Sequence, residues 1–212
     1  MMALKWVILI VAGYLLGNLS AGLIVGKALA GIDIRQHGSG NVGTTNILRT
    51  LGWLPSILTL LGDALKAVAA VLIGRWLGGE AGALIGGLCV VVGHNWPVLW
   101  NFKGGKGMAA SLGVLLVVDP WMALALLAAQ VIVLVATRYM SVASIATSAG
   151  YFVLTAILRV GRPDYWGRFF FALVLSALAL YSHRSNMARL RAGAENRLDF
   201  GKIAILSHVR KK

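Results

Sequence analysis

The chain has 212 residues, of which 58% are hydrophobic and 13% charged, and its formal net charge at pH 7 is +13. This composition is too apolar for a soluble globular domain and is typical of a protein with several membrane spans. The positive charge could indicate a nucleic-acid partner, but we expect none because the basic residues gather in loops between apolar runs. The single cysteine, Cys89, lies in an apolar run and excludes an intramolecular disulfide.

Apolar runs predict seven transmembrane helices, because about 20 apolar residues cross a hydrocarbon layer of about 30 Å. In chain order the runs lie at 6–26, 54–74, 82–99, 107–118, 121–137, 142–158 and 169–182. The fourth run is short and must be tilted or packed inside the bundle. The first run could be a cleaved signal sequence, but its length and the polytopic remainder favour a retained helix. We therefore predict an all-α protein with a single polytopic membrane domain over 1–212.

The distribution of lysine and arginine predicts the orientation of these spans. With seven spans, alternate loops share a side of the membrane, and one side holds most of the basic residues together with the tail. Cytoplasmic loops carry an excess of Lys and Arg, so we expect the N-terminus outside and the C-terminus in the cytoplasm. Residues 184–212 would then form a basic cytoplasmic tail against anionic lipid headgroups.

The first unusual polar segment follows the first span and reads Gly38-Ser-Gly-Asn-Val-Gly-Thr-Thr-Asn-Ile-Leu-Arg49. A glycine-rich loop can turn several backbone N–H groups toward one point and so bind an anion. The planar guanidinium of Arg49 suits two oxygens of one phosphate, although an arginine near a span end can also be a simple interfacial anchor. We interpret this segment as an anion-binding loop.

A second polar segment lies between the third and fourth spans and includes Gly104-Gly-Lys-Gly107. It opens directly into a predicted helix, so the free N–H groups of the first turn and Lys106 face the same place. The spacing of a Walker phosphate loop is absent, which disfavours a nucleotide triphosphate. The plain alternative is a flexible turn whose lysine contacts headgroups.

Further candidates lie at the ends of other spans on the same predicted side. His183 and Asn186 are three residues apart and share a helix face if the last helix continues; a histidine there could act as a base or hold a phosphate. Ser141 could contribute a hydroxyl or serve only as a helix N-cap. His94 precedes a turn at Pro97. The four histidines have no metal-ligand spacing and no carboxylate cluster, so we expect no metal.

Asp63 and Lys66 lie three residues apart within the second predicted span. They share a helical face and are costly in lipid, so they should pair with each other or a neighbour. We expect a structural role for them unless Lys66 reaches the site. The other unusual polar segments all fall on the predicted cytoplasmic side, which favours one site at that surface.

Three signatures in order are similar to those of the bacterial integral-membrane acyl-phosphate:glycerol-3-phosphate acyltransferases. They are Gly38-Ser-Gly-Asn-x-Gly-x-Thr-Asn-x-x-Arg49, then Gly93-His-x-x-Pro97 with Phe102-x-Gly-Gly-Lys-Gly107, and His183-Arg-x-Asn186 with Arg189-Leu and Gly193-x-Glu-Asn196. The resemblance runs over nearly the whole chain. Departures are Thr44 in place of alanine, Trp96 in place of phenylalanine, and Asn18-Leu-Ser20 in place of Ser-Ile-Pro, which leaves the shape of the first helix open.

The resemblance implies transfer of a fatty acyl group from acyl phosphate to the sn-1 hydroxyl of glycerol 3-phosphate. The products would be lysophosphatidic acid and phosphate, in the first acylation step of phospholipid biosynthesis. It implies no cofactor and no thioester donor, and a multi-pass location in the bacterial cytoplasmic (inner) membrane with the active site on the cytoplasmic side. The partners would be membrane lipid and, transiently, the soluble enzyme that makes acyl phosphate.

The resemblance also assigns roles to residues by position. Catalytic roles, including leaving-group stabilisation, fall to Ser39, Arg49, Lys106, Ser141, His183 and Asn186. Substrate binding falls to Gly38, Gly40, Asn41, Thr45, Asn46, His94, Gly104, Gly105 and Gly107. Glu195 would be an architectural anchor for the tail. The proton of the acceptor hydroxyl would go either to His183 or to the donor's own phosphate.

Two other classes of protein remain as alternatives. A membrane carrier for a phosphorylated solute would need polar groups along a path through the bilayer, and often an inverted repeat. The sequence has neither, because its unusual residues gather on one side. A lipid-binding scaffold would leave the glycine loops unexplained.

Overall fold

The computed structural model describes residues 2–199 and 201, and all regular structure in this part of the chain is helical. The α-helices are α1 (Met2–Asn18), α2 (Ala21–Ala30), α3 (Thr44–Leu51), α4 (Trp53–Asn95), α5 (Met108–Val118), α6 (Pro120–Thr137), α7 (Met140–Leu158), α8 (Tyr165–Ser182) and α9 (Arg184–Arg191). Two short 3₁₀ turns, η1 (Ile34–Gln36) and η2 (Val98–Trp100), lie in the loops. The predicted tail over 184–212 lies partly outside the described residues.

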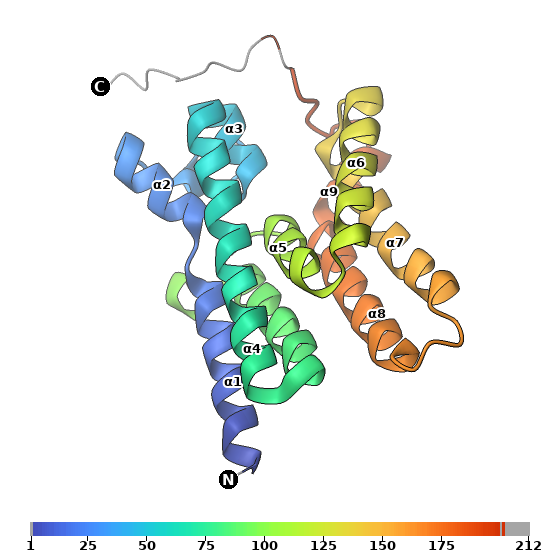
Figure 1. The fold of residues 1–212 in the computed structure, drawn as a ribbon. Helices are drawn as coiled ribbons and strands as arrows, with labels where there is room; N and C mark the ends of the chain where they lie inside the picture. Colours follow the sequence, from blue (N-terminus) through green and yellow to red (C-terminus); the bar gives the residue numbers. More distant parts are fainter. Residues whose placement is uncertain (1, 200, 202–212) are drawn as a thin grey trace.

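The membrane character predicted from composition is confirmed. Among the described residues, five helical stretches are long and apolar enough to cross a membrane: Ala3–Ala30, Trp53–Trp100, Pro120–Thr137, Met140–Leu158 and Tyr165–Ser182. The second stretch leaves helical geometry at Gly78 and Gly79, so α4 folds back on itself and its two arms match the predicted spans at 54–74 and 82–99 (Figure 1). Helix α5 has only 11 residues, as expected for the short fourth run.

The first predicted span is wrong as a single helix, because the chain breaks between α1 and α2. Helix α1 ends at Asn18, and α2 leaves at an angle to it from Ala21 (Figure 1). The break frees backbone carbonyls that lipid cannot satisfy. Lys66 satisfies two of them, since its Nζ donates to Gly17 O at 3.0 Å and to Leu19 O at 2.6 Å. The predicted polar pair in α4 therefore stabilises this break.

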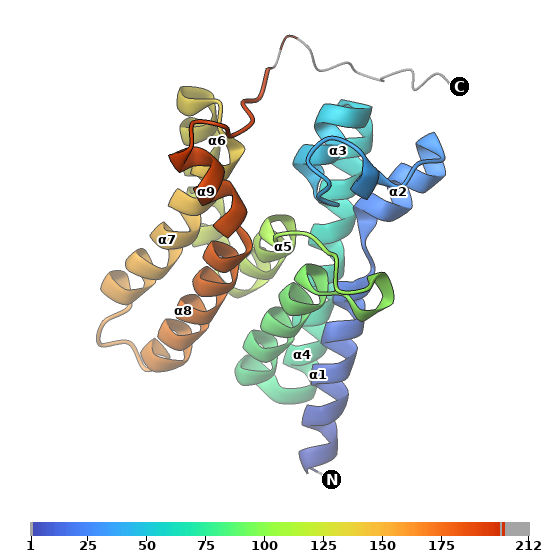
Figure 2. The same cartoon turned by 180° about the vertical axis from the view of Figure 1, so that it is seen from behind.

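The helices form two groups with α5 between them (Figures 1 and 2). One group contains α1 to α4, and the other contains α6 to α9. Helix α5 packs against both arms of α4, and a buried apolar cluster joins α4 and α5 to the second group through Val91, Val114, Leu115, Phe171 and Leu175. The arrangement leaves the N-terminal end of α5 facing the space between α3 and α9.

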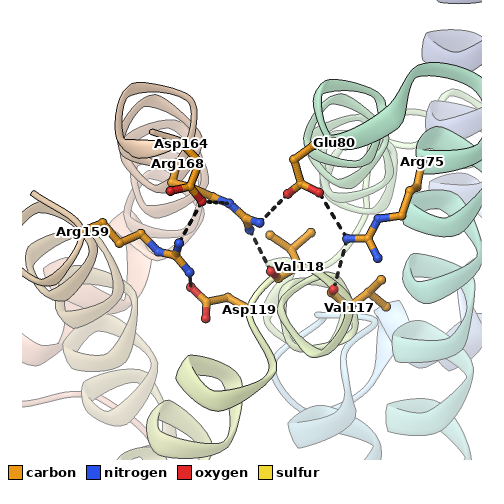
Figure 3. A network of polar contacts seen from close by, with 8 residues as sticks. All are labelled: Arg75, Glu80, Val117, Val118, Asp119, Arg159, Asp164 and Arg168. Carbon is orange, nitrogen blue, oxygen red and sulfur yellow. Dashed lines mark hydrogen bonds and ion pairs between the residues drawn. The ribbon is translucent and has the colours of Figure 1, made fainter. Parts of the chain in front are cut away.

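A network of ion pairs ties the two groups together at the opposite end of the molecule (Figure 3). Glu80, at the turn of α4, pairs with Arg75 and with Arg168 of α8. These two arginines also donate to the last carbonyls of α5, Arg75 to Val117 O at 3.3 Å and Arg168 to Val118 O at 2.8 Å. Cations at a helix C-terminus meet its partial negative charge.

The same network continues to the ends of α6 and α7. Arg159 lies 2.8 Å from Asp119, which precedes α6, and 2.9 Å from Asp164, which precedes α8 (Figure 3). The short helix α5 is thus fixed at its C-terminal end by charged groups from several neighbours, which leaves its N-terminal end as the side where the polar loops meet.

Candidate active site

A cavity of about 560 Å³ lies between the two helix groups and collects most of the residues that the sequence singled out. Its lining includes Ser39, Gly40, Asn41, Thr45, Asn46, Arg49, Asp63, His94, Lys106, Gly107, Ser141, His183, Asn186 and Glu195. A second hollow of about 250 Å³ adjoins it and includes Gly104 and Gly105, with Asn41 and Lys106 shared by both. Gly38 and Lys66 line neither space. Segments far apart in the chain therefore meet at one place, as the sequence predicted.

The first polar segment is a loop only as far as Gly43, because α3 begins at Thr44 and carries Asn46 and Arg49. The expectation of a continuous loop to Arg49 is wrong in this respect. The cause is local: residues 44–51 place Ile47, Leu48 and Leu51 on a buried face and so favour a short amphipathic helix. The helix holds Arg49 in a defined direction.

Asn46 organises the loop before it. Its Oδ1 accepts from the backbone N–H of Ser39 at 2.8 Å, and its Nδ2 donates to the carbonyls of His37 at 2.9 Å and Asn41 at 2.8 Å. Gly38 and Gly40 take left-handed backbone conformations, with φ of 59° and 72°. Asn46 lines the main cavity, where it was predicted to bind substrate, and its side-chain hydrogen bonds fix the shape of the loop.

Arg49 reaches across to the second helix group. Its Nη2 donates to Asn196 O at 3.1 Å, whereas its buried Nε has no partner among the described residues. Burial lowers the pKa of Arg49 from its ordinary value, but an arginine retains its charge in proteins. The guanidinium therefore offers free donors to an anion in the cavity.

Lys106 lies at the junction of the two spaces, and its Nζ donates to Asn186 Oδ1. Burial lowers the pKa of Lys106 to about 8, and the positive charges of Arg189 and Arg49 act in the same direction. Glu195 opposes this shift only in part. A buried excess of positive charge is a favourable place for a phosphate group.

Glu195 gathers three donors from α7 and α9. Ser141 Oγ donates to its carboxylate at 3.0 Å, Asn186 Nδ2 at 2.7 Å and Arg189 Nε at 2.8 Å. Burial alone would raise the pKa of Glu195, but the hydrogen bonds from Asn186, Ser141 and Arg189 outweigh it and hold the pKa below the ordinary 4.5. The carboxylate thus orients side chains at the cavity, which suits the architectural role predicted for it.

His183 is buried at the end of α8 and faces the cavity. Its Nδ1 lies 2.8 Å from Ala179 O, and a carbonyl can only accept, so Nδ1 carries the proton and Nε2 remains an acceptor. Burial lowers the pKa of His183 to about 4, and Lys106 adds to this effect although the bond to Ala179 opposes it. The ring is neutral at pH 7.

The rest of the main cavity is mainly apolar. Away from Arg49 and Lys106 its lining includes Leu112, Leu115, Leu126, Leu134 and Leu175, with hydroxyl side chains of α7 such as Ser144 and Thr147 among them. A single space that is cationic at one end and mainly apolar elsewhere fits a molecule with an anionic head and a hydrocarbon tail.

Sequence reasoning did not assign roles to two residues that the structure brings to the site. Arg189 pairs with Glu195, and its position three residues after Asn186 on one helix could have revealed this. Leu198 is buried, and its backbone N–H donates to Arg138 O at 2.8 Å, which holds the segment after α9 against α7. No local signal predicts that contact. Within residues 2–199 and 201, no group of three or more His, Cys, Asp or Glu side chains could hold a metal ion.

The fold is that of an integral membrane protein, and its cavity can hold a molecule with an anionic head and a hydrocarbon tail. Comparison with known proteins identifies the family to which the chain belongs. The family model for glycerol-3-phosphate acyltransferase matches residues 7–193. The chain therefore belongs to the glycerol-3-phosphate acyltransferase family.

Individual relatives agree with this assignment. The glycerol-3-phosphate acyltransferase of Alkaliphilus metalliredigens (strain QYMF) is 45% identical over 191 residues, which cover 90% of this chain and 95% of that protein. That of Clostridioides difficile (strain 630) is 42% identical over 200 residues, covering 92% and 96%. The crystal structure of PlsY (YgiH), an integral membrane glycerol 3-phosphate acyltransferase, in its glycerol 3-phosphate form superposes with a TM-score of 0.82 at 37% identity, covering 91% of this chain and 95% of that one.

Proposed function

We propose that the protein acylates the sn-1 hydroxyl of glycerol 3-phosphate with a fatty acyl phosphate, in the first acylation step of phospholipid biosynthesis. It is an acyltransferase, and it converts glycerol 3-phosphate to lysophosphatidic acid. Its structural neighbours were solved in a glycerol 3-phosphate form and in a lysophosphatidic acid form, which are the acceptor and the product of that reaction. One observation carries the proposal: the main cavity is cationic at one end and mainly apolar elsewhere.

The cavity suggests where each part of the substrates binds. The acyl chain lies along the apolar walls, and the anhydride group lies beside Arg49 and Lys106. The adjoining hollow, which Gly104 and Gly105 line together with Lys103, receives the phosphate of glycerol 3-phosphate. Lys106 faces both spaces and so contacts both phosphates. This division explains why a single site carries two glycine-rich segments.

The chemical step needs little from the protein because an acyl phosphate has a good leaving group. The hydroxyl oxygen of glycerol 3-phosphate attacks the acyl carbonyl carbon, and the bond between that carbon and the bridging oxygen breaks. Arg49 and Lys106 stabilise the charge that develops on the departing phosphate. Holding the two reactants in place supplies much of the remaining acceleration.

The proton of the hydroxyl goes to the departing phosphate rather than to His183. With a pKa near 4, His183 is a weak base, whereas a phosphate has a second pKa near 6. In the bound substrate the unprotonated Nε2 of His183 accepts a hydrogen bond from the hydroxyl and directs its oxygen toward the carbonyl; as the new C–O bond forms, this proton leaves that hydrogen bond for an oxygen of the departing phosphate.

We place the chain in the bacterial cytoplasmic membrane with seven spans, the N-terminus outside and the C-terminus inside. The two arms of α4, the short helix α5 and the broken first segment support this count. Lys103, Lys106, Arg138 and Arg184 lie at the same end as the cavity's polar part, and such an excess is typical of the cytoplasmic side. Acyl phosphate then arrives from the cytoplasm, by transient contact with the soluble enzyme that makes it.

The decisive experiment mixes the purified protein with palmitoyl phosphate and labelled glycerol 3-phosphate. We expect lysophosphatidic acid and phosphate in equal amounts, and a large loss of both with Lys106→Ala. Palmitoyl coenzyme A in place of palmitoyl phosphate should give no product. Product formed with palmitoyl coenzyme A but not with palmitoyl phosphate would show that the acyl donor is a thioester. Uptake of glycerol 3-phosphate into proteoliposomes without acylation would identify a carrier instead.

A further inference from the structure

One polar side chain interrupts the apolar face of α6 that lines the main cavity. Between Ala123 and Ala136 every residue of this helix except Gln130 has a hydrocarbon side chain. Gln130 lies on the cavity face, between Leu127 and Leu134. An amide in a membrane span is costly unless its hydrogen-bonding groups have partners. Gln130 has no role in the proposed acyl transfer, so its place in this face needs another explanation.

The contacts of Gln130 leave its amide only partly satisfied. Its Oε1 lies 3.1 Å from the hydroxyl oxygen of Thr147 on α7, which runs beside α6 (Figure 1). Thr147 Oγ1 is also 2.9 Å from Ala143 O, and its one proton can serve only one of these acceptors. Among the described residues, Gln130 Nε2 donates only to the thioether of Met140, at 3.6 Å, and sulfur is a weak acceptor. Exchanging the two ends of the amide would leave the same deficit, because one end would still face only the thioether.

Helix α7 adds hydroxyl groups to the same part of the cavity. Ser144 and Thr147 lie three residues apart on one face, and both line the cavity although their exposed fractions are only 2% and 6%. The hydroxyl of Ser144 has no hydrogen-bond partner among the described residues. Beside Gln130 the cavity therefore holds unused hydrogen-bonding groups from two helices, in a space that is mainly apolar.

The depth of these polar groups indicates which part of a substrate meets them. Ser144 and Thr147 follow Ser141 by three and six residues, so they lie about 4.5 and 9 Å deeper along α7. An extended chain advances about 1.2 Å per bond, so these depths correspond to about carbons 5 to 8 of an acyl chain whose carbonyl lies level with Ser141. The polar groups are therefore too deep for either phosphate and lie beside the acyl chain.

We propose that Gln130, Ser144 and Thr147 form a binding site for a hydroxyl group in the first half of the acyl chain. The substrate class is a hydroxylated fatty acyl phosphate. A chain hydroxyl both donates and accepts, so it can bond to the amide and to the free hydroxyl of Ser144. With an unsubstituted chain, Gln130 and Thr147 keep their mutual bond, so the protein accepts that donor too. The inference rests on the proposed acyl transfer and deepens it, because it names a further class of donor.

A purely structural role for Gln130 gives a different expectation. The bond between Gln130 and Thr147 joins α6 to α7, as amide side chains do between other membrane helices. That role uses only one end of the amide, and it gives the hydroxyl of Ser144 nothing to bind. The two roles differ in one measurable respect, because only hydroxyl binding makes the preference between acyl donors depend on these side chains.

The test compares 7-hydroxypalmitoyl phosphate with palmitoyl phosphate as donors, in the purified full-length protein with glycerol 3-phosphate as the acceptor. The quantity measured is the ratio of kcat/KM for the hydroxylated donor to that for the plain donor, in which effects common to both donors cancel. We expect a wild-type ratio of about one or higher, because the polar groups replace the hydrogen bonds that the chain hydroxyl loses on leaving water. Gln130→Leu should lower the ratio by roughly 10- to 100-fold, the effect of burying a hydroxyl without a partner.

Two further variants make the comparison specific. Leu134→Met is the matched control, because Leu134 lies one turn from Gln130 on the cavity face of α6 and the change removes no polar group. Its ratio should equal the wild-type ratio. Ser144→Ala removes only a hydroxyl, so it tests the inference even if Gln130→Leu fails to fold. It should lower the ratio by about threefold to tenfold, the effect of losing one neutral hydrogen bond.

The double variant Gln130→Leu with Ser144→Ala tests whether both side chains contact the same hydroxyl. If they do, its ratio should fall by less than the product of the two single effects, because groups that share a partner are not additive. Strict additivity would contradict a single binding site. A wild-type ratio in both single variants overturns the inference, and lysophosphatidic acid formed from palmitoyl phosphate in the same assay would leave the proposed function intact. Failure to form product from either donor would contradict the proposed function and the inference with it.

Discussion

Lys106 Nζ donates to Asn186 Oδ1, and this contact joins the loop before α5 to the first turn of α9. Lys106 lies in the loop between α4 and α5, whereas Asn186 belongs to the second helix group. Asn186 continues the connection, because its Nδ2 donates to Glu195, which also accepts from Ser141. A chain of hydrogen bonds therefore crosses the polar end of the cavity. The position of Lys106, the lysine that we propose binds phosphate, therefore depends on contacts from the second helix group.

The lowered pKa of Lys106 predicts an unusual alkaline limit for activity. The lysine is a cation below about pH 8 and loses its charge as the pH rises through that value. Because phosphate binding needs the cation, kcat/KM for both substrates should fall above pH 8 rather than near the ordinary lysine pKa of about 10.4. Lys106→Arg, which stays charged, should have a lower maximum but no such fall. Initial rates of phosphate release, measured between pH 6 and 10 in both proteins, test this prediction. If Lys106→Arg loses activity above the same pH as the wild-type protein, the group that titrates is not Lys106.

Replacing Glu195 by glutamine should loosen the polar end of the cavity. The amide keeps one acceptor for Ser141 or Asn186 but loses the ion pair with Arg189, and a hydrogen bond to a charged group contributes about 1.5–3 kcal/mol. We expect a lower thermal midpoint and a fall in kcat of at least about tenfold. Asp199→Asn, which removes a carboxylate from the same segment, is the matched control. If kcat and the thermal midpoint fell by similar amounts in Glu195→Gln and Asp199→Asn, the cause would be the loss of negative charge in general.

Glu195 also predicts how stability depends on pH. Its pKa is lowered in the folded protein, so its contribution is fully present above about pH 4.5 and is lost as the pH falls through the folded pKa. Thermal unfolding followed between pH 3 and 7 should show the wild-type protein losing stability relative to Glu195→Gln at the acidic end. Parallel curves would contradict the ion pair with Arg189.

The sequence correctly predicted that residues in several short motifs meet at one place. Ser39, Lys106 and His183 lie in short motifs at span ends and all line the main cavity, and the apolar runs between them predict the helices. Asn46 was different, because its hydrogen bonds to the preceding loop follow from the helical start at Thr44, which a glycine-rich loop does not predict.

The contacts that sequence reasoning could not supply are those between distant segments. Lys66 satisfies carbonyls of Gly17 and Leu19, which are unpaired only because α1 ends at Asn18. The partner in such a contact depends on how α1 packs against α4 in three dimensions. Likewise, the pairing of Arg49 with Asn196 needs both helix groups in place.

Adding a methyl group at Gly105 should disable the site with little effect on the helices. Its Cβ would lie 2.1 Å from His94 Nε2, so the loop or the ring must move. We expect Gly105→Ala to raise KM for glycerol 3-phosphate by about tenfold or more, because the displaced loop lines the hollow that we propose receives its phosphate. Gly150→Ala is the matched control: it lies inside α7 with its nearest neighbour at 3.8 Å, and alanine favours helix by about 0.5–1 kcal/mol. Normal kinetics for Gly105→Ala would contradict the close approach.

The ion-pair network at the far end should matter for stability rather than for substrate binding. Arg168→Gln removes the contacts with Glu80 and Val118 O, which should cost about 1–2 kcal/mol, since Glu80 is half exposed. Arg162→Gln, the matched control, removes the same charge from an exposed position in the loop just before α8. The thermal midpoint of Arg168→Gln should be lower than that of Arg162→Gln. In both variants KM for both substrates should match the wild-type value. A KM change in Arg168→Gln would connect this end of α5 to the phosphate site.

His183→Gln distinguishes a base from a hydrogen-bond acceptor. The pKa of His183 is lowered to about 4, so the neutral ring persists down to that pH, and the wild-type enzyme should show no acidic limb near the ordinary histidine pKa of about 6.5. If His183 only orients the hydroxyl, the carbonyl oxygen of glutamine can accept the same hydrogen bond, and kcat should fall by about tenfold. If His183 removes the proton, kcat should fall by about 100-fold or more, because a glutamine amide is not a base. Single-turnover rates with palmitoyl phosphate, measured from pH 4 to 8 in both proteins, therefore decide where the proton goes.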